Sequence, residues 1–558
     1  MDVRSSSWWL LAALTVGACG DDVPSVGESA CPQTCTGSAT TDATDGAAAG
    51  STGGTQGTPS TADASAGSDG SGTGGGAGPL EYPDPGDWEP NAGPGGPAVA
   101  FDEADLYTEC AFLLGGPGDF EHHNLVQMFD GYLVMPWAPE WAGGGLSFFD
   151  VSDPCNPVEI GVGSSDKIRE SHAIGFAEVG ARRFALLAFK NAGLFATQGG
   201  VGFWDITDPS APFDAARIEI PGHFYPDAYA RVVLSAFWQY PYVYVGASEN
   251  GIFVIDASDP MNPSIVGEYD IQPVMRTGQV QVIGNLLVAT AAEGPRTVLL
   301  DVSIPELPQP IAGGDFEIAD SMGVNRESYF SNVSGGLVWY AIKSGGGGVL
   351  AYDIRDPSAP TLAGHYDSGG NGGYVFVKEH VAFVGESNFA GVYDVSDPAA
   401  MTQIVTLNLP GDLDTITPIG NVAVLSVDDE AMPGMPTSIV PFRAEVDTQP
   451  PVVEWSVPSD GATDLAVTSR FGVMVSEFVD PRSAWFGSVR VYRTDDDGTV
   501  IPVDGTPSVQ ENIVNFRPNE ALLPGTEYTF EIPAGGITDH NGNPIEETFS
   551  ITFTTREG

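Results

Sequence analysis

The sequence predicts an all-β fold, a seven-bladed β-propeller followed by a smaller β-sandwich. Three observations lead to this prediction. Glycine (71) and proline (44) make up about a fifth of the 558 residues, as expected for a chain with many turns. A strand-and-turn motif recurs roughly every 49 residues, the spacing of four-stranded propeller blades. After residue 447, alternating strand patterns are separated by turns at roughly 8–12 residue intervals, as in β-sandwiches.

The N-terminus has the pattern of an export signal. Arg4 precedes a nine-residue apolar run, residues 8–16, which is too short to span a bilayer and suits a signal peptide. The run ends in Val16-Gly17-Ala18-Cys19, which resembles a bacterial lipobox, where cleavage precedes the cysteine and its thiol is lipidated. We therefore predict a signal peptide at 1–18 and lipidation of Cys19. The lipid would be the only membrane anchor, at the outer membrane or cell surface of a bacterial cell envelope.

Residues 19–97 are predicted to form a disordered tether. Residues 20–97 are mostly Gly, Ser, Thr, Ala, Asp and Pro, with eleven acidic residues and no Lys or Arg. Such a stretch buries too little apolar surface to offset the entropy of ordering. A flexible, self-repelling tether would hold the folded part away from the membrane.

Four further cysteines are disulfide candidates, namely Cys31, Cys35, Cys110 and Cys155. An even number of cysteines in an exported chain favours disulfide pairing, and three pairings are open. Pairing Cys31 with Cys35, and Cys110 with Cys155, gives the shortest loops.

The repeated motif is an apolar strand followed by Asp, an apolar residue, usually a hydroxyl residue, and then Asp-Pro. Its aspartates can bond nearby backbone amides, so we interpret them as structural turn residues rather than metal ligands. Over residues 98–446 the spacing predicts seven blades. The seventh copy of the motif, at 438–442, is degenerate, and six or eight blades also fit the spacing. The first aspartates of the six clear copies are Asp150, Asp205, Asp256, Asp301, Asp353 and Asp394.

These six copies resemble the LVIVD repeat family of bacterial and archaeal surface and secreted proteins, over roughly residues 100–445. The resemblance implies a propeller in an extracellular setting and supplies no catalytic residues. The tail, residues 447–558, resembles bacterial immunoglobulin-like (Ig-like) domains. The segments that carry this second resemblance are 458–462, 522–528 and 539–543.

Histidine and glutamate residues early in the blades are candidate metal ligands. Inner strands line the channel of a propeller, so side chains from several blades can converge there. Imidazole and carboxylate groups suit a transition metal. Our first interpretation is that these residues cap strands, bond between blades or bind channel water, with the metal site as the alternative. The candidates are Glu121, His122, His123, Glu170 and His172.

Two acidic segments, 495–498 and 539–543, are candidate calcium-binding loops, because carboxylate oxygens are ligands of Ca²⁺. Neither has the ligand spacing of an EF-hand. Their Asp, Asn and Gly content is that of hairpin turns, which is our first interpretation, with a calcium-binding turn as the alternative.

The net charge of the chain and the motifs in its sequence exclude some classes of function. The net charge is −53, from 21 basic and 74 acidic residues, which excludes a nucleic-acid binder that neutralises phosphates. The sequence contains no G-x-S-x-G, H-E-x-x-H or Walker A motif. We therefore expect an extracytoplasmic binding platform for a protein, glycan or small ligand, with no catalysis evident. The alternatives are a metal-dependent enzyme with a His/Glu site in the channel, and a structural surface-layer or matrix protein.

Overall fold

The computed structural model describes residues 82–113, 125–138, 143–168, 171–172, 174–191, 197–223, 232–343, 345–426 and 437–558. In these ranges the chain forms 37 strands and three short 3-10 helices, η1 (Pro85–Asp87), η2 (Pro398–Ala400) and η3 (Pro481–Ser483). None of the helices in this described part has the length and apolar character needed to span a bilayer. The all-β prediction is confirmed.

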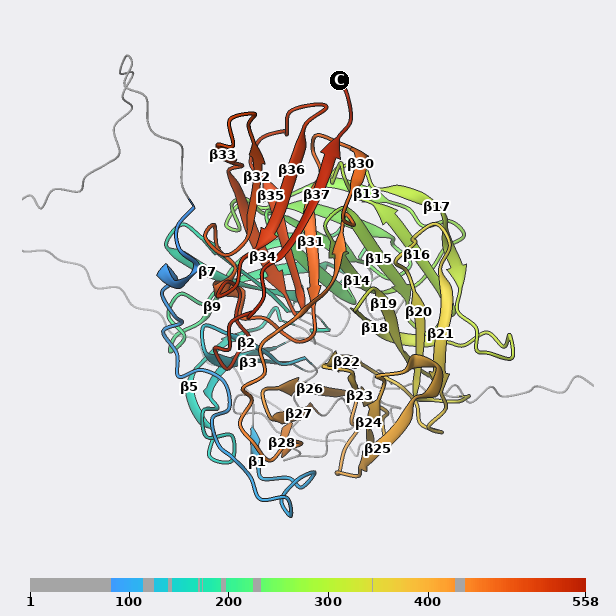
Figure 1. The fold of residues 1–558 in the computed structure, drawn as a ribbon. Helices are drawn as coiled ribbons and strands as arrows, with labels where there is room; N and C mark the ends of the chain where they lie inside the picture. Colours follow the sequence, from blue (N-terminus) through green and yellow to red (C-terminus); the bar gives the residue numbers. More distant parts are fainter. Residues whose placement is uncertain are drawn as a thin grey trace, which may run out of the picture. The chain divides into compact units, whose positions relative to one another are not determined.

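The described residues between 111 and 441 form seven four-stranded antiparallel sheets, which we call the ring (Figure 1). The first three sheets are β2 (Gln127–Phe129), β3 (Tyr132–Trp137), β4 (Gly144–Asp150) and β5 (Val158–Ser165); β6 (Gly175–Val179), β7 (Arg182–Lys190), β8 (Gly199–Asp205) and β9 (Phe213–Glu219); β10 (Ser235–Gln239), β11 (Tyr242–Gly246), β12 (Ile252–Asp256) and β13 (Ser264–Tyr269).

The next three sheets are β14 (Thr277–Ile283), β15 (Leu286–Ala291), β16 (Arg296–Asp301) and β17 (Gln309–Glu317); β18 (Ser328–Ser334), β19 (Leu337–Ile342), β20 (Val349–Asp353) and β21 (Thr361–Tyr366); β22 (Val375–Lys378), β23 (Val381–Gly385), β24 (Ala390–Asp394) and β25 (Thr402–Leu407). The seventh sheet joins β26 (Thr415–Ile419), β27 (Val422–Ser426) and β28 (Thr437–Pro441) to β1 (Ala111–Leu113).

The first strands of successive sheets from β6 to β26 are neighbours, and Phe129 of β2 stacks on Phe176 of β6. We call β2, β6, β10, β14, β18, β22 and β26 the inner strands. They are rich in β-branched and aromatic residues, which suit strands that are buried on both faces. Phe129, Phe176, Phe330 and Phe376, from four inner strands, belong to one buried apolar cluster. The middle of the ring is therefore packed with side chains.

The seventh sheet is built from both ends of the ring. Strand β1 pairs antiparallel with β28, Ala111 opposite Ile439 and Leu113 opposite Thr437. A disulfide between Cys110 and Cys155, with 5.1 Å between the Cα atoms, links the residue before β1 to the turn after β4. The predicted pairing of these two cysteines is confirmed. The closing strand is thus attached to the first sheet covalently and to the last sheet by hydrogen bonds.

The tail folds as the predicted β-sandwich. One sheet has the order β29 (Val453–Val457), β31 (Phe471–Val475), β35 (Ile513–Pro518) and β34 (Gly505–Gln510). The other has the order β30 (Ala462–Leu465), β37 (Phe549–Thr555), β36 (Glu527–Ile532), β32 (Arg490–Thr494) and β33 (Val500–Pro502). Inward-facing side chains of both sheets, including Phe471, Phe530 and Phe553, form one buried core.

Residues 82–97, which their composition assigns to the tether, contact the folded domains. The Tyr82 hydroxyl donates to the carbonyl of Val491 at 2.5 Å, and its ring packs on Phe486. The Gly96 amide donates to the carbonyl of His540 at 2.9 Å. Tyr82 is one of the few large apolar residues in that stretch, and its burial offers a physical reason for the order here.

Candidate functional site

The repeat aspartates all end the third strand of their sheets. In each copy the Asp Oδ1 accepts a hydrogen bond of 2.7–3.0 Å from the backbone amide two residues later. This is an Asx turn, which starts the connection to the outer strand. The six aspartates are Asp150, Asp205, Asp256, Asp301, Asp353 and Asp394.

The tail contacts the ring where the inner strands end, and we call this the tail face. The opposite end of the inner strands defines the distal face. Asn515 of β35 accepts from the Gly284 amide at 2.7 Å and donates to the Val282 carbonyl at 2.9 Å. The guanidinium of Arg470 donates to the Val302 carbonyl at 2.6 Å. The tail therefore binds backbone groups at the ends of strands of the fourth sheet.

The turn between β34 and β35 reaches the inner strands themselves. Gln510 accepts from the Trp238 amide of β10 at 2.9 Å. The carboxylate of Glu511 accepts from the side chains of Gln281 on β14 at 2.8 Å and Asn332 on β18 at 3.2 Å. Burial raises the pKa of Glu511 to about 7, because no positive charge compensates the desolvated carboxylate. One polar turn of the tail thus ties together three neighbouring blades.

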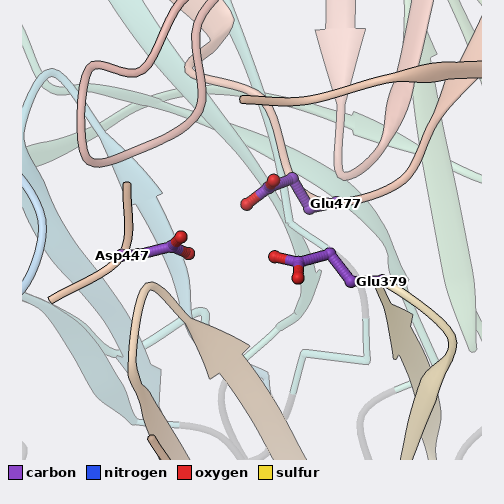
Figure 2. Close-up of side chains that lie close together, drawn as sticks. All are labelled: Glu379, Asp447 and Glu477. Atoms are coloured by element: carbon purple, nitrogen blue, oxygen red, sulfur yellow. The ribbon is translucent and has the colours of Figure 1, made fainter. Parts of the chain in front are cut away.

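A second contact surrounds Lys378, at the end of β22. Figure 2 shows the carboxylates of Glu379, Asp447 and Glu477 facing a common point. These are the only three described residues that could together hold a metal ion. The Lys378 ammonium lies 3.0 Å from Glu379 and 2.8 Å from Asp447, and it also bonds Glu477. The lysine therefore supplies the positive charge that a cation would otherwise provide.

The electrostatics of this cluster follow from its burial. Burial disfavours the ammonium, but the surrounding carboxylates outweigh it and raise the pKa of Lys378. Burial, reinforced by Asp539 and Asp447, raises the pKa of Glu477 against the opposing effect of Lys378. Outside the cluster, Arg443 binds Glu379 with two hydrogen bonds of 2.7 and 3.1 Å. The group joins the ring to the tail by charge.

Of the predicted metal ligands, the described residues include only His172. Its Nδ1 lies 2.5 Å from the Tyr374 hydroxyl, and its ring stacks on Phe330 with centroids 5.0 Å apart. His172 is buried, and it precedes β6 at the distal end of the inner strands. Glu121, His122, His123 and Glu170 lie outside the described residues, as do Cys19, Cys31 and Cys35. The channel metal site stays a prediction.

The two acidic turns are held by their own amides. Asp539 accepts from the backbone amides of Asn541 at 2.9 Å and Asn543 at 2.8 Å. Asp497 accepts from the Thr499 amide at 2.9 Å. Such bonds stabilise turns without any ion. Loop calcium remains a prediction that these contacts do not require.

Two of the cavities in the described part of the chain bear on where a ligand could bind. One of about 400 Å³ is bounded by ring residues such as Leu286 and Arg355 and by tail residues such as Trp455 and Val457. The other, of about 860 Å³, lies at the distal end of the β14–β17 sheet and includes Val274 in its wall. The larger cavity is therefore on the face that the tail leaves uncovered.

Sequence reasoning did not identify Gln510, Glu511 or Lys378. A polar Gln-Glu-Asn turn between two strand patterns is ordinary hairpin chemistry, and nothing local indicates that it is buried. Lys378 meets Asp447 and Glu477 only in the folded chain. The one signal that could have found it is a lysine at the end of an apolar strand pattern, because a lysine that becomes buried needs an acidic partner.

Family comparisons match both parts of the chain. Residues 447–555 match the family described as bacterial Ig-like domain. Residues 241–271 and 333–368 match the LVIVD repeat. The chain carries LVIVD repeats and a C-terminal bacterial Ig-like domain. The matched segments contain Asp256 and Asp353, so the Asx turns of these two copies lie within the matched repeats. Among curated proteins, no match to the sequence is found.

Several solved structures resemble this chain. A protein from Lactobacillus plantarum is 9% identical with a TM-score of 0.40, over 71% of this chain and 98% of the other. The WD40 β-propeller domain of Doa1 is 11% identical with a TM-score of 0.41, over 58% and 94%. A computationally designed protein is 12% identical with a TM-score of 0.39, over 60% and 99%. Similarity at this level says nothing about ligand or activity.

Proposed function

We propose that this chain is a lipid-anchored protein of the bacterial cell envelope whose ring is an extracytoplasmic binding platform. LVIVD repeats together with a bacterial Ig-like domain support an extracellular-type interaction module. The Cys110–Cys155 disulfide suits an oxidising compartment. The partner class is a protein, a glycan or a small ligand outside the cytoplasm.

The observation that carries the proposal is the difference between the two faces of the ring. The tail binds the tail face through Asn515, Gln510, Glu511 and the Lys378 cluster. The distal face carries the connections between sheets and the larger cavity. Loops held on a rigid scaffold are where binding proteins place their recognition residues. A partner is therefore expected on the distal face.

The anchor is supported by the lipobox-like sequence that ends at Cys19 and by the acidic tether that follows it. The test is metabolic labelling with a radioactive fatty acid in a bacterial host, followed by membrane fractionation. The wild-type chain should carry label and sediment with membranes, and Cys19→Ala should do neither. Cys31→Ala is the control and should be labelled like the wild type. Label that persists in Cys19→Ala contradicts the anchor.

The platform is tested with the Cys19→Ala protein, which lacks the predicted anchor. The immobilised chain should retain a component of the cell envelope or the medium that the heat-unfolded chain does not retain. Retention of nothing by the folded chain would count against a binding platform and favour the structural alternative.

A further inference from the structure

The 860 Å³ cavity is formed by segments that share the distal face. Residues 273–276 precede β14, residues 291–296 connect β15 to β16, and residues 315–317 end β17. Glu249, from the third sheet, completes the wall. The cavity thus lies between the third and fourth sheets, away from the tail.

The two arginines of the cavity are already neutralised by carboxylates in its wall. Arg276 pairs with Glu293 at 2.6 Å. Arg296 binds both oxygens of Asp315, at 2.8 and 2.7 Å, and also donates to the carbonyl of Gln272 at 2.9 Å. A bidentate pair with this geometry fixes the arginine as a structural element. Neither arginine is therefore well placed to attract an anionic ligand.

Two further carboxylates in the wall are not neutralised in this way. Glu317 accepts a 2.5 Å hydrogen bond from the neutral amide of Asn325. Glu249 is exposed, and neither residue forms an ion pair with a basic residue of the described part. With both arginines paired, Glu249 and Glu317 leave the cavity with negative charge, in a chain that is strongly acidic overall.

The loop between β17 and β18 follows the cavity wall directly after Glu317 and exposes apolar side chains. The buried carboxylate of Asp320 accepts from the amides of Met322 at 2.8 Å and Val324 at 3.0 Å. Arg326 donates to Asp320 at 3.0 Å and to Asp367 at 3.2 Å, which fixes the base of the loop. Met322 is nonetheless 76% exposed and Val324 52%. The Asn325–Glu317 hydrogen bond joins this loop to the cavity wall.

We propose that this cavity and the adjoining loop dock a peptide segment of a partner protein that carries both apolar and basic side chains. The inference rests on the proposed function and specifies where the platform binds and what it recognises. Val274, 57% exposed in the cavity wall, and Met322 supply apolar contact. Glu249 and Glu317 favour a lysine or arginine. The loop is already ordered, so binding costs little conformational entropy.

The test uses a short fluorescent peptide in which lysine and leucine alternate, with a matched peptide that has glutamate in place of lysine. Binding to the full chain is followed by fluorescence anisotropy at about 0.15 M salt, which screens diffuse attraction between distant charges. The lysine peptide should bind and the glutamate peptide should not. Val274→Ser with Met322→Ser should weaken binding about tenfold, as for central apolar contacts.

Control variants match the exposure of the substituted residues. Val158 is 55% exposed on β5, and Leu307 is 59% exposed on the turn before β17, so Val158→Ser with Leu307→Ser should leave affinity unchanged. Glu249→Gln with Glu317→Gln should also weaken binding, and Glu268→Gln on β13 should not. Equal affinity across cavity and control variants, or equal binding of both peptides, would overturn the docking site. The capture test on the whole platform would be unaffected by that result.

Discussion

The carboxylate of Glu511 accepts a 2.8 Å hydrogen bond from the side-chain amide of Gln281, so the tail reaches an inner strand of the ring. Asn332 on the next inner strand donates to the same oxygen. Two blades are thereby joined through one residue of the Ig-like domain. The tail is consequently packed on the tail face of the ring and is not a separate spacer.

This contact predicts a pH-dependent stability. The pKa of Glu511 is about 7 in the folded chain, above its ordinary value of 4.5, so the folded state holds a proton that the unfolded state releases between these values. The contribution of Glu511 to the free energy of unfolding is therefore fully present below about pH 4.5, and it is lost as the pH rises toward 7. The loss from this residue is about 3 kcal/mol. Glu511→Gln keeps an oxygen that can accept the same two bonds and has no proton to lose.

The measurement is denaturant unfolding of wild type and Glu511→Gln from pH 4.5 to 8. The variant should be the more stable at pH 8, and the difference should vanish near pH 4.5. Glu268→Gln, at an exposed position, controls for the removal of one charge. A wild type that exceeds Glu511→Gln in stability at pH 8 would mean that the ionised carboxylate is favoured in the folded state.

Replacing Lys378 should destabilise the junction of ring and tail. Lys378→Met leaves three carboxylates around the site without their ammonium, and breaking a buried pair in this way costs about 3–5 kcal/mol. Lys167→Met removes a partly exposed lysine paired with Asp166 and should cost less than about 1 kcal/mol. Adding Glu477→Gln to Lys378→Met should recover part of the stability. Losses of equal size for Lys378→Met and Lys167→Met would contradict a buried cluster.

The Cys110–Cys155 disulfide should contribute strongly to ring closure, because β1 has only three residues to pair with β28. The two cysteines are 45 residues apart, and a loop of this length corresponds to about 4 kcal/mol in the chain-entropy treatment. Cys110→Ser with Cys155→Ser should lower the free energy of unfolding by that order. Reductant should lower wild-type stability to the level of the double variant and leave the variant unchanged. Insensitivity of the wild type to reductant would contradict this role.

Elemental analysis distinguishes the metal alternatives. In the wild type, the position of Lys378 predicts that no divalent cation binds between Glu379, Asp447 and Glu477. The full chain should be purified without chelators or affinity histidines. A transition metal in the wild type that is lost in His172→Ala would instead support the channel site and the enzyme alternative. Calcium lost in Glu477→Gln would contradict the assignment of Lys378 as the cluster's cation.

The sequence indicated the fold because the fold is repetitive and local. Each copy of the motif carries its own strand and Asx turn. Asp256, for example, bonds the amide of Ser258 only two residues later, so its turn can be predicted from the local sequence. The tail contacts were not predictable, because the surface that receives Glu511 exists only when several inner strands lie side by side. His172 illustrates the same limit, since its partner Tyr374 is 202 residues away. The contacts of Tyr82 were not predicted either, because composition assigned its stretch to the disordered tether.

The most direct test of the central claim is photo-crosslinking in the bacterial envelope from one residue on each face. A photoreactive phenylalanine analogue replaces Met322 on the distal face or Leu307 on the turn before β17, both of which are exposed. The account predicts a discrete crosslinked partner from position 322 and none from position 307. A partner captured from position 307 and not from position 322 would contradict it.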